Sequence, residues 1–230
     1  DPAAAGRYYA RMAVKQVDGI IVAAHDPAVF AAGAGAELED GRPDLPLVTV
    51  DWPGCRGPSV LLDLEDGGFQ ATRHLVEHGH RRVGLVTVAG NAPNVREVNS
   101  GYRRALAEAG LAEDPALVAA APAWDMDAGR AAMGRLLALP QPPAAVFAIS
   151  DSLALGVLAE LKAAGLRAPD DVALASFNDM PTAGLLDPPL TSVSAPIREL
   201  GAQAMRMLRE IIAGRALSQA EIVLPVKLVV

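Results

Sequence analysis

The stretch Pro143-Ala-Ala-Val-Phe-Ala-Ile-Ser-Asp151-Ser-Leu-Ala-Leu-Gly156 is an apolar run that stops at a polar pair and turns directly into a second apolar run. The first run predicts a buried strand over 144–149, and the second predicts a helix over 153–164. Open α/β sheets bind ligands in the crevice beyond the carboxyl ends of their strands. The sequence therefore predicts a small-molecule site close to Ser150 and Asp151.

Short β-branched runs alternate with longer helical patterns on both sides of this stretch. We expect strands over residues 17–22, 45–50, 82–88, 117–121, 144–149, 172–177 and 222–230. We expect helices over residues 69–78, 101–109, 128–139, 153–164 and 197–213. Strands and helices that alternate in this way form parallel sheets with helices packed on their faces. The predicted fold class is therefore α/β with a parallel sheet.

The composition is that of a folded, acidic protein. The chain has 230 residues, of which 51% are hydrophobic, enough to bury one large core or two small ones. The formal net charge of -7 argues against this segment holding a nucleic acid backbone, since such a surface needs clustered Lys and Arg. Cys55 is the only cysteine, so no intrachain disulfide can form, and a reducing cytoplasm fits this. No apolar run is long enough to span a membrane, so no membrane partner is expected.

The sequence lacks the motifs of common catalytic and metal sites. His74 and His78 lie one helical turn apart, but without the Glu placement of an HExxH zinc motif. The serines lack a GxSxG elbow, and the glycine-rich segments lack the order that cradles phosphates. We therefore expect no enzyme, no metal and no cofactor, and we interpret the two histidines as part of a solvated helix face.

Eight short segments, each weak alone, are specific as a set because of their order and spacing. One is the stretch from Pro143 to Gly156, and the others are Val17-Asp-Gly-Ile-Ile-Val22, Leu45-Pro-Leu-Val-Thr-Val-Asp51, His74-Leu-Val-Glu-His-Gly-His-Arg-Arg-Val83, Gly101-Tyr-Arg-Arg-Ala-Leu106, Pro169-Asp-Asp-Val172, Phe177-Asn-Asp179 and Pro189-Leu-Thr-Ser-Val193. With these segments the chain resembles the effector-binding core of the LacI/GalR family of bacterial transcription regulators. That core shares its fold with type I periplasmic sugar-binding proteins, and the resemblance covers essentially the whole chain.

The resemblance implies two subdomains of the periplasmic binding protein type I-like fold, each built on a doubly wound parallel sheet. We expect the N-terminal subdomain to take residues 1–62 and 196–224, and the C-terminal subdomain to take residues 63–195 and 225–230. In this family the effector binds between the subdomains. Its binding would shift the balance between open and closed forms by its differential affinity for the two.

The N-terminal segment of this chain differs from that of family members. Members begin with a helix-turn-helix and a hinge helix, followed by the first strand, first helix and second strand of the core. Residues 1–16 resemble the helix after that second strand. We therefore expect this chain to lack the DNA-reading part and two sheet strands, which leaves the N-terminal subdomain incomplete.

Trp124 is the first residue that the resemblance assigns to the effector site. It stands five places before Gly129, in a loop between a predicted strand and a predicted helix. In relatives the aromatic residue at this place stacks on the ligand, because a flat π-face packs well on a pyranose or a purine. The alternative is a half-buried tryptophan that covers the helix entrance.

Two pairs at predicted strand ends complete the implied site. Asp51 can accept ligand hydroxyls with Trp52 beside it, or Asp51 caps the following loop while Trp52 packs against Pro53. Ser150 is expected to face the ligand. Asp151 is expected to cap the following helix or to reach the ligand.

Three positions depart from the pattern of the sugar-binding members. Val98 stands where the family has a ligand-gripping Arg, and Arg96 and Asn94 in the same predicted loop either replace it or are solvated. Asn178 takes the first of two acidic positions and can both donate and accept. Ala195 stands where sugar binders often have Gln. We therefore expect an effector that is less hydroxyl-rich than a simple hexose, or differently oriented.

These features together predict the ligand-sensing domain of a cytoplasmic LacI/GalR-type regulator. It would bind a sugar, a nucleoside or a related metabolite, and it would control operator DNA through a helix-turn-helix absent from this chain. The resemblance also implies a homodimer, paired partly through residues 67–78 and 182–189. The alternative is a type I periplasmic solute-binding protein of a transporter, which requires a signal peptide before Asp1.

Overall fold

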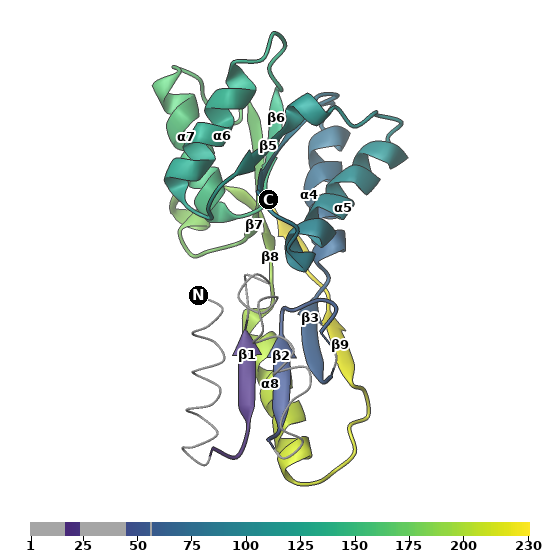
Figure 1. Cartoon of the computed structure of the whole chain (residues 1–230). Coiled ribbons are helices and arrows are strands. Elements are labelled where there is room, and N and C mark those ends of the chain that lie inside the picture. Colours follow the sequence, from purple (N-terminus) through teal and green to yellow (C-terminus); the bar gives the residue numbers. More distant parts are fainter. Residues whose placement is uncertain (1–16, 24–44, 56) are drawn as a thin grey trace. The chain divides into compact units, whose positions relative to one another are not determined.

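The computed structural model describes residues 17–23, 45–55 and 57–230, and these residues form two compact units (Figure 1). The first unit takes its described residues from 1–63, 92–94 and 196–225, and the second consists of 64–91, 95–195 and 226–230. Each unit has its own parallel sheet, which confirms the predicted α/β fold class. The helix expected over residues 1–16 lies outside the described residues.

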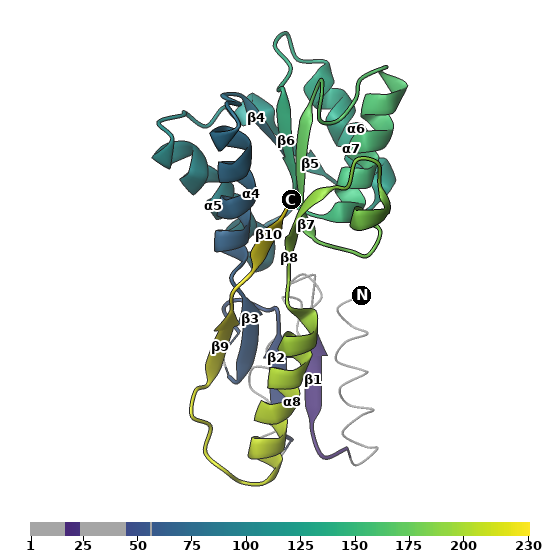
Figure 2. The same ribbon diagram turned by 180° about the vertical axis from the view of Figure 1, so that it is seen from behind.

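The first unit contains a four-stranded parallel sheet with the order β1-β2-β3-β9. Its strands are β1 (Ile20–Ala23), β2 (Leu47–Val50), β3 (Ser59–Leu62) and β9 (Glu221–Leu224). Helix α8 (Ile197–Ile212) packs on β1, β2 and β3, as Figure 2 shows from behind. Its buried residues recur at helical spacing, so one face of the helix covers the sheet: Leu200, Ala204, Met207 and Leu208.

The second unit contains a six-stranded sheet with the order β10-β8-β7-β6-β4-β5. Its parallel strands are β4 (Val83–Val88), β5 (Val118–Ala121), β6 (Ala145–Ala148), β7 (Ala173–Asn178) and β8 (Thr191–Ser194). Strand β10 (Lys227–Val229) runs antiparallel to β8 at one edge. Every residue of β4 and β6 is buried, because helices cover both faces of a parallel sheet.

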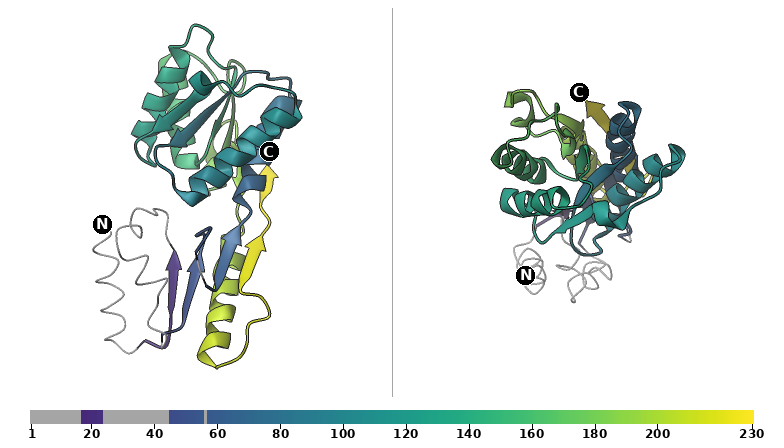
Figure 3. Two further views of the ribbon diagram at one scale, coloured as in Figure 1. Left: turned by 45° about the vertical axis from the view of Figure 1, so that its right-hand side comes forward. Right: turned by 90° about the horizontal axis from the view of Figure 1, so that it is seen from above.

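Two helix pairs cover the faces of this second sheet. Helices α4 (Leu64–Glu77) and α5 (Pro93–Glu108) lie on one face, and α6 (Met126–Leu137) and α7 (Asp151–Ala163) lie on the other (Figure 3). The structure also contains two short 3₁₀ turns, η1 (Pro115–Leu117) and η2 (Ala183–Leu185). This arrangement is the doubly wound layering expected for the second unit.

Glycines make close backbone contact possible within each helix pair. A Cβ atom added at Gly101 on α5 would lie 2.0 Å from the carbonyl oxygen of Glu65 on α4, and one at Gly68 would lie 2.1 Å from the carbonyl oxygen of Val98. A Cβ atom at Gly156 on α7 would lie 2.1 Å from the carbonyl oxygen of Met126 on α6. These distances leave no room for a side chain.

Tyr102, next to Gly101, fixes α5 to the sheet. The side chain is fully buried, and its hydroxyl donates to the carbonyl oxygen of Val83 at the start of β4 over 2.8 Å. Burial, with Glu113 and Asp114 nearby, raises the pKa of Tyr102 above its ordinary value. The phenol therefore stays protonated as a hydrogen-bond donor.

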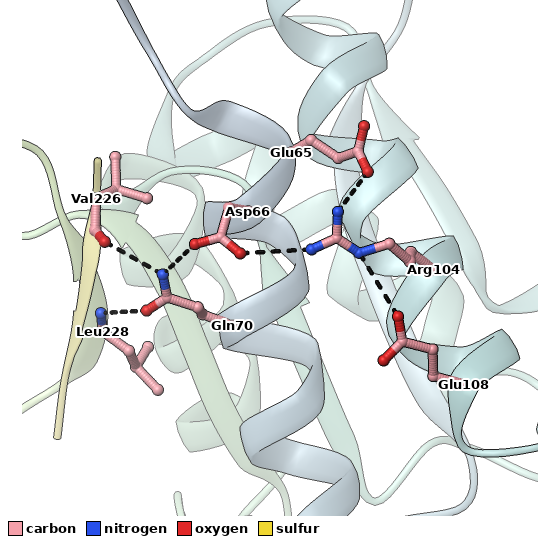
Figure 4. A network of polar contacts seen from close by, with 7 residues as sticks. All are labelled: Glu65, Asp66, Gln70, Arg104, Glu108, Val226 and Leu228. Carbon is pink, nitrogen blue, oxygen red and sulfur yellow. Dashed lines mark hydrogen bonds and ion pairs between the residues drawn. The ribbon is translucent and has the colours of Figure 1, made fainter. Parts of the chain in front are cut away.

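A polar network on α4 anchors the C-terminal strand β10 (Figure 4). Gln70 donates from Nε2 to the carbonyl oxygen of Val226 over 3.1 Å, and its Oε1 accepts from the Leu228 amide over 2.9 Å. Gln70 Nε2 also donates to Asp66 Oδ2 over 2.6 Å, and Arg104 Nη2 donates to Asp66 Oδ1 over 3.4 Å. The side-chain amide of Gln70 thus forms hydrogen bonds with the backbone along the outer edge of β10, as a neighbouring strand would. These bonds block the pairing of a further strand there.

The structure corrects several predicted elements. Strands β3 and β8 were not predicted. Helices α4 and α5 begin at Leu64 and Pro93, earlier than the predicted starts at residues 69 and 101. The single strand predicted over 222–230 is two strands, β9 and β10. Pro225 divides that strand, because proline cannot donate to a ladder and β9 and β10 belong to different sheets. Helix α5 begins at Pro93, since proline suits the first turn of a helix.

Candidate functional site

The parallel strands of the second unit end at one common edge of their sheet. The residues there are Val88 on β4, Ala121 on β5, Ala148 on β6, Asn178 on β7 and Ser194 on β8. Carboxyl ends of parallel strands are the usual ligand-binding edge of such sheets. Of the predicted site residues, the structure places Trp124, Ser150 and Asn178 at this edge or in the loops directly after it.

Trp124 lies in the loop between β5 and α6 with 40% of its surface exposed. The next residue, Asp125, is the N-cap of α6, and its carboxylate accepts from the Ala128 amide over 2.8 Å. Met126 follows with 49% exposure. The cap holds the backbone beside Trp124, while the indole keeps an accessible surface that a flat ligand can cover.

Ser150 is the N-cap of α7. Its backbone is extended, its side chain is buried, and its Oγ accepts from the Leu153 amide over 3.3 Å. The expectation that Asp151 caps this helix is therefore wrong. Asp151 is already the first helical residue, so its predecessor has the geometry that lets a side chain reach back to the free amides.

Asp151 is 1% exposed and lies inside a group of donors. Its Oδ1 accepts from the hydroxyls of Ser176 on β7, over 2.5 Å, and Ser192 on β8, over 2.8 Å. Its Oδ2 accepts from the Met180 amide over 2.6 Å. The position of this carboxylate at the first turn of α7 is also favourable for a negative charge. Both oxygens are thus bonded within the second unit.

Unusual backbone conformations also occur at strand ends. Asn178 has a φ of 110° and Asp179 a φ of 51°, and both lie where β7 ends. Asp51 has a φ of 53° and directly follows β2 in the first unit. In the part of the chain that the structure describes, these are the three non-glycine residues with positive φ. Strained backbone of this kind is concentrated at functional sites in proteins.

Asp51 and Trp52 stand at the carboxyl end of β2, as expected. The Asp51 amide donates to the carbonyl oxygen of Val60 on β3 over 2.9 Å, which ties this position to the sheet. The Trp52 side chain is 8% exposed, whereas Asp51 is half-buried. Of the two, Asp51 therefore has the larger exposed fraction.

Asn94, Arg96 and Val98 lie on the first two turns of α5 and not in a loop. Asn94 is 9% exposed, Val98 is 6% exposed and Arg96 is exposed. Residues two apart on a helix do not share a face. The prediction of a loop here is therefore wrong, and Arg96 and Val98 point to different sides of the helix, whereas a contact between Arg96 and the effector stays a prediction.

Several polar residues inside the sheet were not predicted from the sequence. Thr87 on β4 donates to the side-chain oxygen of Asn99 on α5 over 3.0 Å, and Ser176 and Ser192 bond to Asp151. The available signal was a hydroxyl residue inside an otherwise apolar strand. Such a residue needs a buried partner, which the pattern alone does not identify.

His74 lies in the last turn of α4, and His78 directly follows the helix. The rings of His74 and His78 lie 4.3 Å apart between centroids, and partial burial together with His78 lowers the pKa of His74. Over the described ranges, no three His, Cys, Asp or Glu side chains are grouped to hold a metal ion. Of the helices that the structure describes, none is long and apolar enough to cross a membrane.

Comparisons with known proteins relate this architecture to one group of regulators. Residues 72–230 match the periplasmic binding protein-like domain family. The chain is 33% identical over 201 residues to the HTH-type transcriptional repressor CytR of Escherichia coli strain K12, which covers 87% of this chain and 58% of CytR. It is 30% identical over 230 residues to the HTH-type transcriptional regulator DegA of Bacillus subtilis, which covers 100% of this chain and 68% of DegA.

Solved structures of transcriptional regulators are also similar to this chain. The transcriptional regulator CelR in complex with cellobiose superposes with a TM-score of 0.84 at 33% identity, over 98% of this chain and 68% of that one. A LacI family transcriptional regulator from Mycobacterium smegmatis has a TM-score of 0.84 at 31% identity, over 100% of this chain and 82% of that one. The chain thus spans between roughly three fifths and four fifths of these relatives.

Proposed function

Because this chain belongs to the LacI family of transcriptional regulators, with its periplasmic binding protein-like core, we propose that it is the ligand-sensing part of such a regulator. It binds a small-molecule effector and thereby controls binding of operator DNA by a helix-turn-helix outside residues 1–230. The net charge of -7 supports a role in sensing more than in holding DNA. The relatives are repressors and regulators, which favours this function over that of a transporter's solute-binding protein.

The observation that carries the proposal is the exposed indole of Trp124 at the carboxyl edge of the second sheet. An aromatic face and a few polar groups are the usual lining of a small-molecule site. We propose that Asn178 and Ser150 contribute from the same edge, and that Asp51, Trp52, Asn94 and Arg96 also contact the effector. The effector class that suits an indole face with amide and hydroxyl groups is a sugar, a nucleoside or a related metabolite.

Replacing Trp124 with alanine is expected to weaken effector binding by roughly 1–3 kcal/mol, because the stacking surface is lost. The effector is first selected by thermal shift with cellobiose, ribose, cytidine and adenosine, and calorimetry of the best stabiliser then gives the affinity. Trp124→Phe is the matched control, since it keeps an aromatic ring and should lose less. Unchanged affinity in a folded Trp124→Ala protein contradicts the stacking role, and no stabilisation by any small molecule in a wider screen contradicts the proposed function.

We propose that the regulator is a homodimer that pairs partly through α4 and the segment around η2. Leu185 is 82% exposed and Met180 is 43% exposed in that segment, and exposed apolar side chains of this size suit an interface. Light scattering after size exclusion should give the mass of a dimer for the wild type, and Leu185→Glu should shift it toward the monomer. Met205→Glu on α8, also at an exposed apolar position, should not. A monomeric wild type would rule out the dimer.

A further inference from the structure

The end of β7 adopts a conformation that L-residues avoid. Asn178 has a φ of 110°, which lies beyond the usual left-handed region, and Asp179 has a φ of 51°. Such a conformation is unfavourable in isolation and persists only where the surroundings determine it strongly. Asn178 is nevertheless exposed at the edge of the sheet, so its own side chain is not buried in a way that would impose this conformation.

Backbone amides after Asn178 supply the constraint. The Asp179 amide donates to Ser192 Oγ on β8 over 3.0 Å, and the Met180 amide donates to Asp151 Oδ2 over 2.6 Å. Ser192 in turn donates to Asp151 Oδ1 over 2.8 Å. The Met180 amide is thus bonded directly to the Asp151 carboxylate, and the Asp179 amide is linked to the same carboxylate through the Ser192 hydroxyl. Hydrogen bonds to a charged group are stronger than neutral ones, which suits them to hold a strained segment.

The carboxylate is itself rigidly held. Asp151 is 1% exposed, and Ser176 and Ser192 are fully buried. Asp151 is the first residue of α7, a helix of thirteen residues. Ser176 adds a third donor from β7 itself, at 2.5 Å. A buried group that is fully hydrogen-bonded has little freedom to move, so the strained segment is tied to a fixed point of the fold.

We propose that Asp151 is a positioning residue, which holds residues 178–180 in their strained conformation and thereby presents Asn178 to the effector in a fixed orientation. This inference rests on the proposed function for its last step, the contact between Asn178 and the effector. It replaces direct ligand contact as the role of Asp151. A site whose polar group is set before binding loses less conformational entropy when the ligand arrives.

Two serine variants that differ in the hydrogen bond to the Asp179 amide test this proposal. Ser192→Ala and Ser176→Ala each remove one buried hydroxyl that bonds to Asp151 Oδ1, but Ser192 alone also accepts from the Asp179 amide. NMR of the full chain measures hydrogen exchange at Asp179 and Met180 without any ligand. Ser192→Ala should accelerate exchange at Asp179 by about tenfold relative to Ser176→Ala, as expected for the loss of one part-buried hydrogen bond. Equal exchange rates at Asp179 in the two variants overturn the proposal.

Calorimetry with cellobiose or cytidine, whichever stabilises the wild type more, tests the step that involves the effector. Ser192→Ala should weaken binding severalfold more than Ser176→Ala, and this difference should vanish in an Asn178→Ala background. A difference that persists without the Asn178 side chain overturns the positioning role toward the effector. If neither compound nor any in a wider screen binds the wild type, the proposed function fails and so does the last step, while the exchange rates still decide whether Asp151 holds the segment.

Discussion

Gly129→Ala is expected to destabilise the protein by about 3 kcal/mol or more, because α6 and α7 touch through their backbones at this residue. A Cβ atom there would lie 2.3 Å from the carbonyl oxygen of Leu153 and 2.8 Å from its Cα atom. Neither atom can turn away as the end of a flexible side chain would. The helices would have to separate, and the apolar contacts along the whole pair would loosen. Chemical denaturation of the purified chain measures the loss.

Gly134→Ala is the matched control on the same helix. A Cβ atom at Gly134 would meet only the flexible carboxylate of Glu160, at an ordinary 3.5 Å. Alanine is a better helix former than glycine, so this substitution should stabilise the protein by about 0.5–1 kcal/mol. The two glycines are thus expected to give effects of opposite sign. Similar effects at both would show that the backbones do not meet closely at Gly129.

Apolar patterning was sufficient to predict the fold class of this chain, whereas its family was predicted from the resemblance of short segments in their order and spacing. Buried strands such as β4 and β6 consist of β-branched and small apolar residues, and their helices follow at regular intervals. That alternation requires parallel sheets in any chain that folds compactly. The segments that carry the family resemblance coincide with tight packing, since Gly101 and Tyr102 fix α5 against α4 and β4.

Strand β8 shows why the remaining elements could not be predicted in the same way. Its sequence is Thr-Ser-Val-Ser, which has little apolar character. Ser192 is nevertheless fully buried, because it bonds to Asp151, 41 residues earlier in the chain. A periodicity argument treats such a serine as exposed and therefore rejects the strand. The first turns of α5 were missed for a related reason, since Asn94 and Arg96 make that segment look like a polar loop.

The candidate site was predicted by position more accurately than by role. The sequence identified the polar pair after β6, but Ser150 and Asp151 are both good capping residues, and only the backbone decides which of them is the cap. The contribution of Asp151 depends on donors from β7, β8 and the loop after β7. Those three segments are brought together by the sheet and not by any local pattern.

Asp151→Ala should therefore destabilise the protein by about 3 kcal/mol, since the Met180 amide and the Ser192 hydroxyl would lose their acceptor in a buried place. Each unsatisfied buried donor costs about 1–3 kcal/mol. Asp125→Ala is the control, because that carboxylate is exposed and accepts from one amide, as an N-cap worth about 1 kcal/mol. Urea denaturation compares the two variants. Equal losses would mean that the donors around Asp151 find other acceptors, whereas a clearly larger loss in Asp151→Ala than in Asp125→Ala shows that β7, β8 and α7 depend on one carboxylate.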